Sequence, residues 1–195
     1  MDMPRDDTSH LPDEVLLSRY ASGDQRVAAE LATRHLPRVF RHARRLLGDA
    51  AAAEDVAQEA MMRLWKIAAE WRAGEAQVST WLYRVTANLC TDILRRRPSV
   101  ALDAIAERAD PAPGAVQIMQ ENARAQALQD ALDALPDRQR EAVVLRHIEG
   151  LANPEIGEIM GLSTRAVESL TARGKRSLQG LLEGRREELG FEDDR

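Results

Sequence analysis

The chain has 195 residues and a formal net charge of −5, a length that allows one domain or two small ones. No apolar run approaches the roughly 18 residues needed to span a bilayer, and the acidic N-terminus matches neither a secretory signal nor a transit peptide. Cys90 is the only cysteine, so an intramolecular disulfide is excluded. These features predict a cytoplasmic protein without membrane insertion.

The first part of the chain is predicted to form short helices. Residues 1–11 are expected to be disordered. Asp13 is expected to cap one helix, which ends at Gly23, and Asp24 to cap a second helix, which Pro37 interrupts or kinks. In the helix that follows, the expected inward residues are Val39, Ala43, Leu46 and Leu47.

Two amphipathic helices with a Trp-bearing connection between them span residues 53–97. Apolar residues recur every three or four positions in each helix, which predicts one buried stripe on each. The stripe of the first helix consists of Val56, Ala60, Leu64, Ile67 and Ala68, and that of the second of Leu82, Val85, Thr86, Leu89 and Ile93. Ser79 is expected to cap the second helix. Cys90 lies near this stripe, so we expect a packed, inert thiol.

The outward stripe of the second helix combines an indole, an amide and several guanidinium groups. Its members are Trp81, Arg84, Asn88, Asp92 and Arg95, and it ends in Arg96 and Arg97. Arginine suits phosphates and guanine edges, an amide suits adenine, and an indole can stack on an unpaired base. The stripe therefore favours a nucleic-acid contact, although an ordinary charged helical surface gives the same periodicity.

After residue 97 the chain changes character. Residues 98–120 contain three prolines and little periodicity, as is typical of an interdomain linker. Further on, Asp137 is expected to cap one helix, and Asn153, followed by Pro154, to cap a short one. Gly161 then makes a turn, and Ser163 caps the last helix, a pattern that predicts a helix-turn-helix.

The last helix is expected to bury Val167, Leu170, Leu178 and Leu181. In a helix-turn-helix the second helix enters the major groove with its first residues at base edges. Arg165, Glu168 and Ser169 are therefore candidates for reading bases, and Arg173, Lys175 and Arg176 for holding phosphates. A helix that exposes charge without contacting DNA is the alternative.

Residues 53–97 resemble conserved region two of the sigma-70 family, in its extracytoplasmic-function group. The matches to the DxxQE signature are Asp55, Gln58 and Glu59; those to the WLYRIARNLxxDxLRRR signature are Trp81, Leu82, Tyr83, Arg84, Asn88, Asp92, Arg95, Arg96 and Arg97. The resemblance continues into region four and covers residues 13–182. It implies an all-α protein of two small helical domains on a flexible linker, the second with a helix-turn-helix.

The resemblance also implies a division of the chain and a function. After the N-terminal segment, residues 12–97 would bind core RNA polymerase and the minus-ten element, and residues 121–184 the minus-thirty-five element, with an acidic tail at 185–195. The protein would direct promoter-specific transcription initiation of a stress or envelope-response regulon. An anti-sigma factor would hold it in check.

The resemblance assigns three sets of site residues. Those for polymerase binding are Asp55, Gln58, Glu59 and Met62. Those for the minus-ten element are Trp71, Ser79, Trp81, Arg84, Asn88, Arg95 and Arg96, although Trp71 could equally pack in the core. Those for the minus-thirty-five element are Ser163, Thr164, Arg165, Glu168, Ser169, Arg173, Lys175 and Arg176.

The last helix departs from the family pattern. Glu168 replaces a frequent Lys, Leu170 a frequent Arg, and Gly174 lies in mid-helix, where glycine costs about 1 kcal/mol relative to alanine. These departures bear on the promoter sequence and leave the fold unaffected.

The sequence gives little support for metal binding, cofactor binding or catalysis. The histidines are scattered, and we expect His35 and His42 to pack at the surface. The sequence lacks metal-ligand clusters and phosphate-binding glycine motifs, so we predict no metal, no cofactor, no small-molecule substrate and no catalysis. A freestanding helix-turn-helix regulator and an adaptor that has lost DNA binding are the alternative functions.

Overall fold

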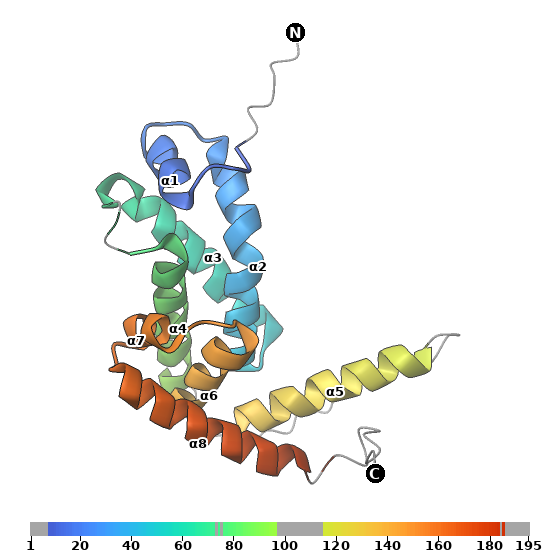
Figure 1. Cartoon of the computed structure of the whole chain (residues 1–195). Helices are drawn as coiled ribbons and strands as arrows, with labels where there is room; N and C mark the ends of the chain where they lie inside the picture. Colours follow the sequence, from blue (N-terminus) through green and yellow to red (C-terminus); the bar gives the residue numbers. More distant parts are fainter. Residues whose placement is uncertain (1–7, 73, 75, 97–114, 184, 186–195) are drawn as a thin grey trace.

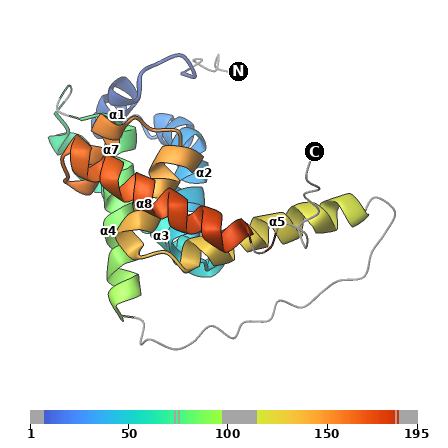
Figure 2. The same cartoon turned by 60° about the horizontal axis from the view of Figure 1, so that its bottom comes forward.

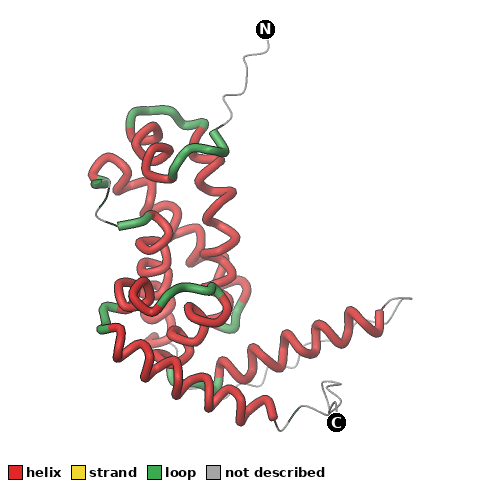
Figure 3. The backbone as a smooth tube through the Cα atoms, in the orientation of Figure 1, coloured by secondary structure: helices red, strands yellow, loops and turns green. Residues whose placement is uncertain are grey.

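The computed structural model describes residues 8–72, 74, 76–96, 115–183 and 185, and these are helices and loops with no strand among them. The all-α prediction is therefore confirmed for these ranges (Figure 3). Most of the expected disordered N-terminus, most of the expected linker and nearly all of the acidic tail lie outside the described residues. None of the described helices combines the length and apolarity that crossing a membrane requires.

The first domain consists of the helices α1 (Asp13–Ala21), α2 (Val27–Leu47), α3 (Ala50–Ile67) and α4 (Val78–Arg96), with the 3-10 turn η1 (Ala68–Glu70) after α3. Their apolar stripes meet in one core because each helix has a single continuous apolar face. The core residues are Leu16, Leu17, Leu31, Val39, Ala57, Ala60, Leu64, Val78 and Leu82. Of the stripe predicted for this helix, Ala60, Leu64 and Ala68 lie in this core, Val56 is buried in the cluster shared with the second domain, and Ile67 is only partly buried.

The second domain consists of α5 (Ala115–Asp133), α6 (Asp137–Val143), α7 (Asn153–Met160) and α8 (Thr164–Glu183), with a single π-helical turn, η2 (Val144–Ile148), after α6. The predicted helix-turn-helix is formed by α7 and α8. Gly161 adopts a φ of +64° between them, a conformation that glycine reaches without steric cost. The Ser163 hydroxyl accepts a hydrogen bond from the Ala166 N–H at 3.3 Å, which confirms it as the cap of α8.

The two domains pack against each other. In Figures 1 and 2, α6 lies against the half of α2 that is distant from α1, α7 lies against the first half of α4, and α5 projects to one side. One hydrophobic cluster draws on both domains: Ala43, Leu46, Leu47, Ala53, Val56, Ala87 and Cys90 from the first, Leu132, Leu135, Val143 and Val144 from the second. Helical periodicity did not predict this contact. It identifies the apolar face of a helix but not the segment that packs on that face.

Pro37 was predicted to interrupt or kink its helix, and the structure excludes the interruption. Instead, α2 is continuous from Val27 to Leu47 with Pro37 inside it. The missing N–H and the clash of the proline ring cost about 3 kcal/mol in an isolated helix. Buried residues on either side, including Leu31 and Val39, hold both halves of α2 against the same core, and this packing offsets the cost.

Five predicted caps lie at different positions. Asp24 lies two residues before Arg26, the cap position of α2, and Asp137 is the first residue of α6. Asp13 is the first residue of α1, and its carboxylate accepts hydrogen bonds from Arg34 at 2.9 Å and pairs with His35 at 2.7 Å. Ser79 lies inside the first turn of α4, which begins at Val78. The cap of α7 is Ala152, whose N–H donates to the Glu155 carboxylate at 2.8 Å.

Burial also corrects three predictions. His35 and His42 were expected at the surface, but they are 4% and 0% exposed, because α2 is covered by the first-domain core and by the second domain. Leu181 was expected to be buried and is 42% exposed, since it lies near the end of α8, beyond the region that α6 covers. The burial of Cys90, by contrast, is confirmed, and it raises the pKa of the thiol to about 12.

Candidate nucleic-acid and protein interfaces

The outward face of α3 carries the residues assigned to polymerase binding. Asp55 and Gln58 are exposed, and Met62, at 52% exposure, is the most exposed large apolar side chain among the described residues. The Glu59 carboxylate accepts a hydrogen bond from Arg63 at 2.8 Å, which holds the pKa of that carboxyl below its usual range. This face therefore presents acidic, amide and thioether groups to a partner.

An apolar groove of about 330 Å³ lies beside this face, between α2 and α3. It is lined by Leu36, Pro37, Phe40, Ala57 and Gln58, with Glu54 at its rim. Leu36 is 39% exposed although it is large and apolar. Neither Leu36 nor Phe40 was among the predicted site residues. Leu36 and Phe40 are four residues apart, on either side of Pro37. This spacing indicates a shared helical face only once α2 is known to be continuous through Pro37.

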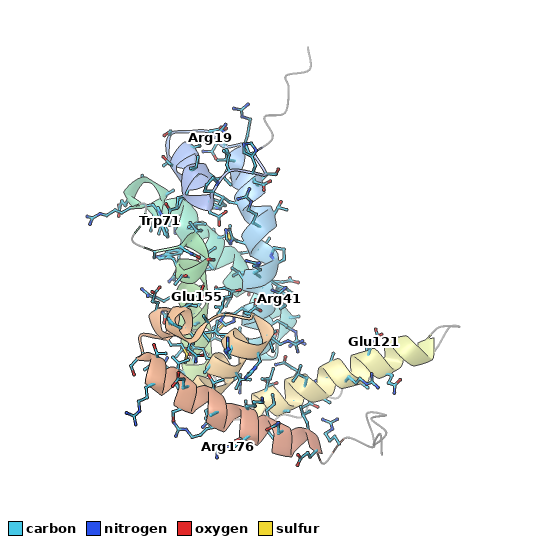
Figure 4. All side chains as sticks on the ribbon, viewed as in Figure 1. Arg19, Arg41, Trp71, Glu121, Glu155 and Arg176 are labelled. Carbon is cyan, nitrogen blue, oxygen red and sulfur yellow. The ribbon has the colours of Figure 1, made fainter. Side chains whose placement is uncertain are left out.

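Two indoles meet where η1 leads into the loop before α4. Trp71 and Trp81 contact edge to face, with ring centroids 6.1 Å apart, and both are partly buried against the first-domain core. The Nε1 of Trp71 is buried without a hydrogen-bond partner. Figure 4 shows Trp71 at this end of the domain. The structure thus brings together two residues assigned to the minus-ten element, and it shows that packing and exposure are combined at both.

Beside Trp71 lies a cavity of about 350 Å³ whose polar lining comes from Glu14, Ser18 and Ser22 of α1 and its end. Glu14 also accepts a hydrogen bond of 3.4 Å from the N–H of Gly74, in the loop before α4. Ser79 lies close to this loop, with its hydroxyl 3.5 Å from the Gln77 side-chain oxygen. Helix α1, which the sequence analysis did not include in the site, therefore forms one wall of it.

Three residues of the outward stripe of α4 lie beside the second domain while their side chains remain exposed. The Arg84 guanidinium donates a hydrogen bond to the carbonyl oxygen of Glu158 in α7. Further along, Asn88 and Arg95 line an interdomain cavity of about 510 Å³ together with Arg138 and Glu141 of α6. Of the residues assigned to the minus-ten element, Arg84, Asn88 and Arg95 thus lie next to another domain.

The residues assigned to the minus-thirty-five element form one open face of α8. All of them are exposed: Ser163, Thr164, Arg165, Glu168, Ser169, Arg173, Lys175 and Arg176. Figure 4 shows Arg176 on the side of α8 that points away from the molecule. A helix-turn-helix binds duplex DNA in this way: a tight turn and a cap position the start of the second helix, and basic groups lie on its exposed face.

Among the described residues, no group of three or more His, Cys, Asp or Glu side chains is arranged to hold a metal ion. The exposed arginines and the partly covered indoles are groups that bind anions and flat rings. The geometry therefore supports contacts with nucleic acid and with protein.

Family models match both domains. Residues 31–99 match sigma-70 region 2, and residues 125–178 match sigma-70 region 4. Among curated proteins, the chain is 38% identical to the ECF RNA polymerase sigma factor SigE of Mycolicibacterium smegmatis, over 83% of this chain and 65% of that protein. It is 34% identical to the RNA polymerase sigma factor CarQ of Myxococcus xanthus, over 85% of this chain and 95% of that protein.

Solved structures show the same architecture. CnrH in complex with the cytosolic domain of CnrY superposes with a TM-score of 0.68 at 27% identity, covering 88% of this chain and 97% of CnrH. RpoE of Bartonella quintana, in complex with the anti-sigma factor NepR, gives a TM-score of 0.64 at 24% identity, covering 80% and 96%, and shows the fold alone.

The fold and the paired regions define a sigma-70 family protein, built from region 2 and region 4. Its relatives narrow this further: the chain belongs to the extracytoplasmic-function sigma factors, the group that recruits RNA polymerase to particular promoters.

Proposed function

We propose that this chain is a dissociable promoter-specificity subunit that docks on core RNA polymerase through α3. Asp55, Gln58 and Glu59, at the positions the family uses against a coiled coil of the largest polymerase subunit, share one accessible face with Met62. The neighbouring groove with Leu36 extends this face with apolar surface. A partly apolar patch with a few polar groups is the composition of a protein interface.

We propose that the first domain also captures bases of the minus-ten element. The residues that carry this role are Trp71, Ser79, Trp81, Arg84, Asn88, Arg95 and Arg96. Extrusion of a base costs a few kcal/mol, and stacking on an indole can offset that cost. The cavity of about 350 Å³ beside Trp71 supports this assignment, since it is polar and lies at the loop that the family uses.

We propose that α8 binds the minus-thirty-five element in the major groove. Arg165, Glu168 and Ser169, near its start, would read bases, while Arg173, Lys175 and Arg176 would hold phosphates. Two separately weak contacts with DNA gain from being tethered in one chain, because the second contact then benefits from a high effective concentration.

The proposed function also has a cellular location, a regulator and a set of target genes. The protein acts in the cytoplasm, where promoter DNA and polymerase are found, and the phosphodiester chemistry belongs to the polymerase. An anti-sigma factor is the proposed regulator, and the complex of the similar protein CnrH with the cytosolic domain of CnrY supports a protein partner of this kind. The proposed regulon is one of stress or envelope response.

The observation that carries the proposal is the coexistence, in one chain, of two exposed faces of different chemistry: the face of α3 with carboxylate and thioether groups, and the basic face of α8. Run-off transcription tests it. Core polymerase is mixed with this protein and a pool of genomic promoter fragments, and discrete new start sites are expected.

The start sites should vanish with Asp55→Ala/Glu59→Ala. They should persist with Glu70→Ala/Glu121→Ala, which removes the same charge from exposed positions elsewhere. Binding to core polymerase without initiation would indicate the adaptor instead. Tight binding to duplex DNA that is independent of polymerase would indicate the freestanding regulator.

A further inference from the structure

The π-helical turn η2 is packed beside α8, the helix that is proposed to enter the major groove. Leu145 of η2 lies in one apolar cluster with Val167 of α8. Further along α8, Gly174 lies so close to Val143, the last residue of α6, that a Cβ atom on the glycine would meet Val143 at 2.6 Å. These two contacts fix the position of η2 relative to the exposed face of α8.

Two basic side chains of η2 are exposed at this position. Arg146 and His147 follow the buried residue Leu145 and are both exposed. His147 lies one helical turn after Val143, so it is on the side of this segment that α8 contacts. Lys175 comes directly after Gly174 in α8 and is also exposed. The imidazole of His147 and the ammonium group of Lys175 therefore lie close together.

The charges of this group repel one another in the free protein. Partial burial lowers the pKa of the His147 imidazole, and the positive charges of Lys175 and Arg146 lower it further. One of these charges belongs to η2 itself and the other to α8, so the effect depends on how the two elements are packed. An anion bound beside the three groups would relieve the repulsion.

The Arg146 guanidinium is held in place by the loop that leads to α7. Its Nη1 donates a hydrogen bond of 2.9 Å to the carbonyl oxygen of Leu151. Gly150, with a φ of +75°, makes the turn between the two residues. A side chain that is already fixed loses less conformational entropy when it binds a ligand. Arg146 is therefore prepared to bind an anion, and a guanidinium suits the oxygens of a phosphate.

The basic side chains of η2 continue the basic face of α8. Lys175 belongs to both surfaces, since it lies beside His147 and shares the exposed face of α8 with Arg173 and Arg176. A helix that lies in the major groove is flanked by the phosphate backbones of the two strands. Cations beside such a helix meet these phosphates, so the anion that fits this surface is the backbone of duplex DNA.

We infer, on the basis of the role proposed above for α8, that Arg146 and His147 bind backbone phosphates beside the minus-thirty-five element. With Lys175 they form what we call the η2 phosphate site. His147 makes its contact as the imidazolium ion, so the affinity of the protein for duplex DNA rises in mild acid. The site adds affinity for any sequence and leaves the reading of bases to the start of α8.

The direction of the pH dependence follows from the charges around His147. In the free protein, partial burial and the cations Lys175 and Arg146 favour the neutral imidazole. A phosphate beside the ring favours the imidazolium ion, so the pKa of His147 is higher in the complex than in the free protein. Binding therefore takes up a proton when the pH lies between these two pKa values, and the affinity rises as the pH falls through this window.

The experiment measures binding of the full-length protein to a labelled random-sequence duplex of about 30 base pairs, because phosphate contacts do not depend on sequence. Fluorescence anisotropy gives the affinity over a series of salt concentrations, at pH 6 and at pH 8. The unsubstituted protein should bind about three-fold more tightly at pH 6 than at pH 8. His10→Gln is the matched control, since it removes an exposed histidine of the first part of the chain and should keep this difference.

Three variants separate a phosphate contact from a structural role. His147→Gln should reduce the slope of log affinity against log salt by about one at pH 6 and leave it unchanged at pH 8. His147→Arg should keep the steeper slope at both pH values, because its charge does not titrate in this range. Arg146→Gln should reduce the slope by about one at both pH values. A loss of structure at His147 would not depend on pH in this way, and urea denaturation checks that each variant is folded.

Three results overturn the η2 phosphate site: equal affinity of the unsubstituted protein at pH 6 and pH 8, a pH dependence that persists in His147→Gln, or an unchanged slope in both η2 variants. If Arg176→Ala still lowers the slope in the same experiment, the proposed role of α8 stands without this site. If Arg176→Ala also has no effect, or the protein binds no duplex, the proposed role of α8 fails and the η2 phosphate site fails with it.

Discussion

A Cβ atom placed on Gly174 of α8 would lie 2.6 Å from the Cγ2 of Val143 in α6. The same Cβ would lie 3.1 Å from the Gln139 carbonyl oxygen. The glycine that interrupts the recognition helix in the sequence is therefore the point at which α8 approaches α6 most closely. It sets the depth at which the recognition helix is seated on its support.

Gly174→Ala should destabilise the protein by about 1–3 kcal/mol, because overpacking outweighs the gain of about 1 kcal/mol in helix propensity. Gly180→Ala, in the same helix, is the control, since its Cβ would meet nothing within 4 Å. It should stabilise by up to about 1 kcal/mol. Urea denaturation measures both, and equal effects of the same sign would contradict the packing explanation.

Arg140, in α6, is a buried guanidinium that joins the ends of two other helices, α2 and α5. It donates to the carbonyl oxygens of Leu132 at 2.8 Å, Asp133 at 2.7 Å and, across the domain interface, Leu46 at 2.6 Å. Arg140→Lys should cost about 2–4 kcal/mol, because an ammonium group cannot reproduce this planar set of donors. Arg138→Lys alters a partly exposed ion pair and should cost less than about 1 kcal/mol. Thermal unfolding of the two variants tests the difference.

The burial of His42 predicts that the protein loses stability in mild acid. Burial lowers the pKa of its imidazole from 6.5 to about 4; the facing Glu149 carboxylate opposes this shift, and Arg41 adds to it. Below pH 6.5 the unfolded chain binds a proton that the folded protein accepts only near pH 4, so stability falls as the pH drops through this window. The loss should be about 1 kcal/mol per pH unit.

His42→Leu should remove this part of the pH dependence, since neither ring nitrogen of His42 has a hydrogen-bond partner to lose. The measurement is the free energy of unfolding at pH 7, 6 and 5. His10→Leu, at an exposed position, should retain the full slope. A His42→Leu protein with an unchanged slope would assign the acid sensitivity to other groups.

Substitution of Met62 should weaken polymerase binding and leave the stability of the protein nearly unchanged. Because its side chain is 52% exposed, Met62→Ser should change the free energy of unfolding by no more than about 0.5 kcal/mol. It should weaken binding to core polymerase about ten-fold, as expected for an apolar anchor at the centre of an interface. Leu181→Ser, at a comparably exposed position on α8, should change neither quantity. Titration of labelled protein with core polymerase provides the measurement.

Two arginines of α8 should differ in what they contribute to DNA binding. Arg165, in the first turn, should carry sequence preference, so Arg165→Ala should cost about 1–3 kcal/mol at one base pair of the minus-thirty-five element. Arg176→Ala should weaken binding to all sequences alike and reduce the salt dependence by about one phosphate contact. Competition binding with duplexes substituted at single positions, repeated at several salt concentrations, distinguishes these roles.

Much of the fold is determined by short-range patterns in the sequence. The apolar stripe around Val56 and Leu64, the exposed stripe of Asp55 and Met62, and the turn at Gly161 all follow from helical periodicity and from the backbone preference of glycine. Such signals lie within a few residues of one another, so the sequence alone defines them. The family signatures are of the same kind, and the matches to region 2 and region 4 confirm them.

The tertiary structure decided which partner covers each face. Pro37 remains inside a helix, and His42 is buried, because groups distant in the sequence pack around α2. Tyr83 and Glu149, 66 residues apart, meet only because the second domain closes on α4. Periodicity shows which face of a helix is apolar, but it does not identify the segment that covers that face. The covering segment is distant in the sequence, so no local pattern marks it.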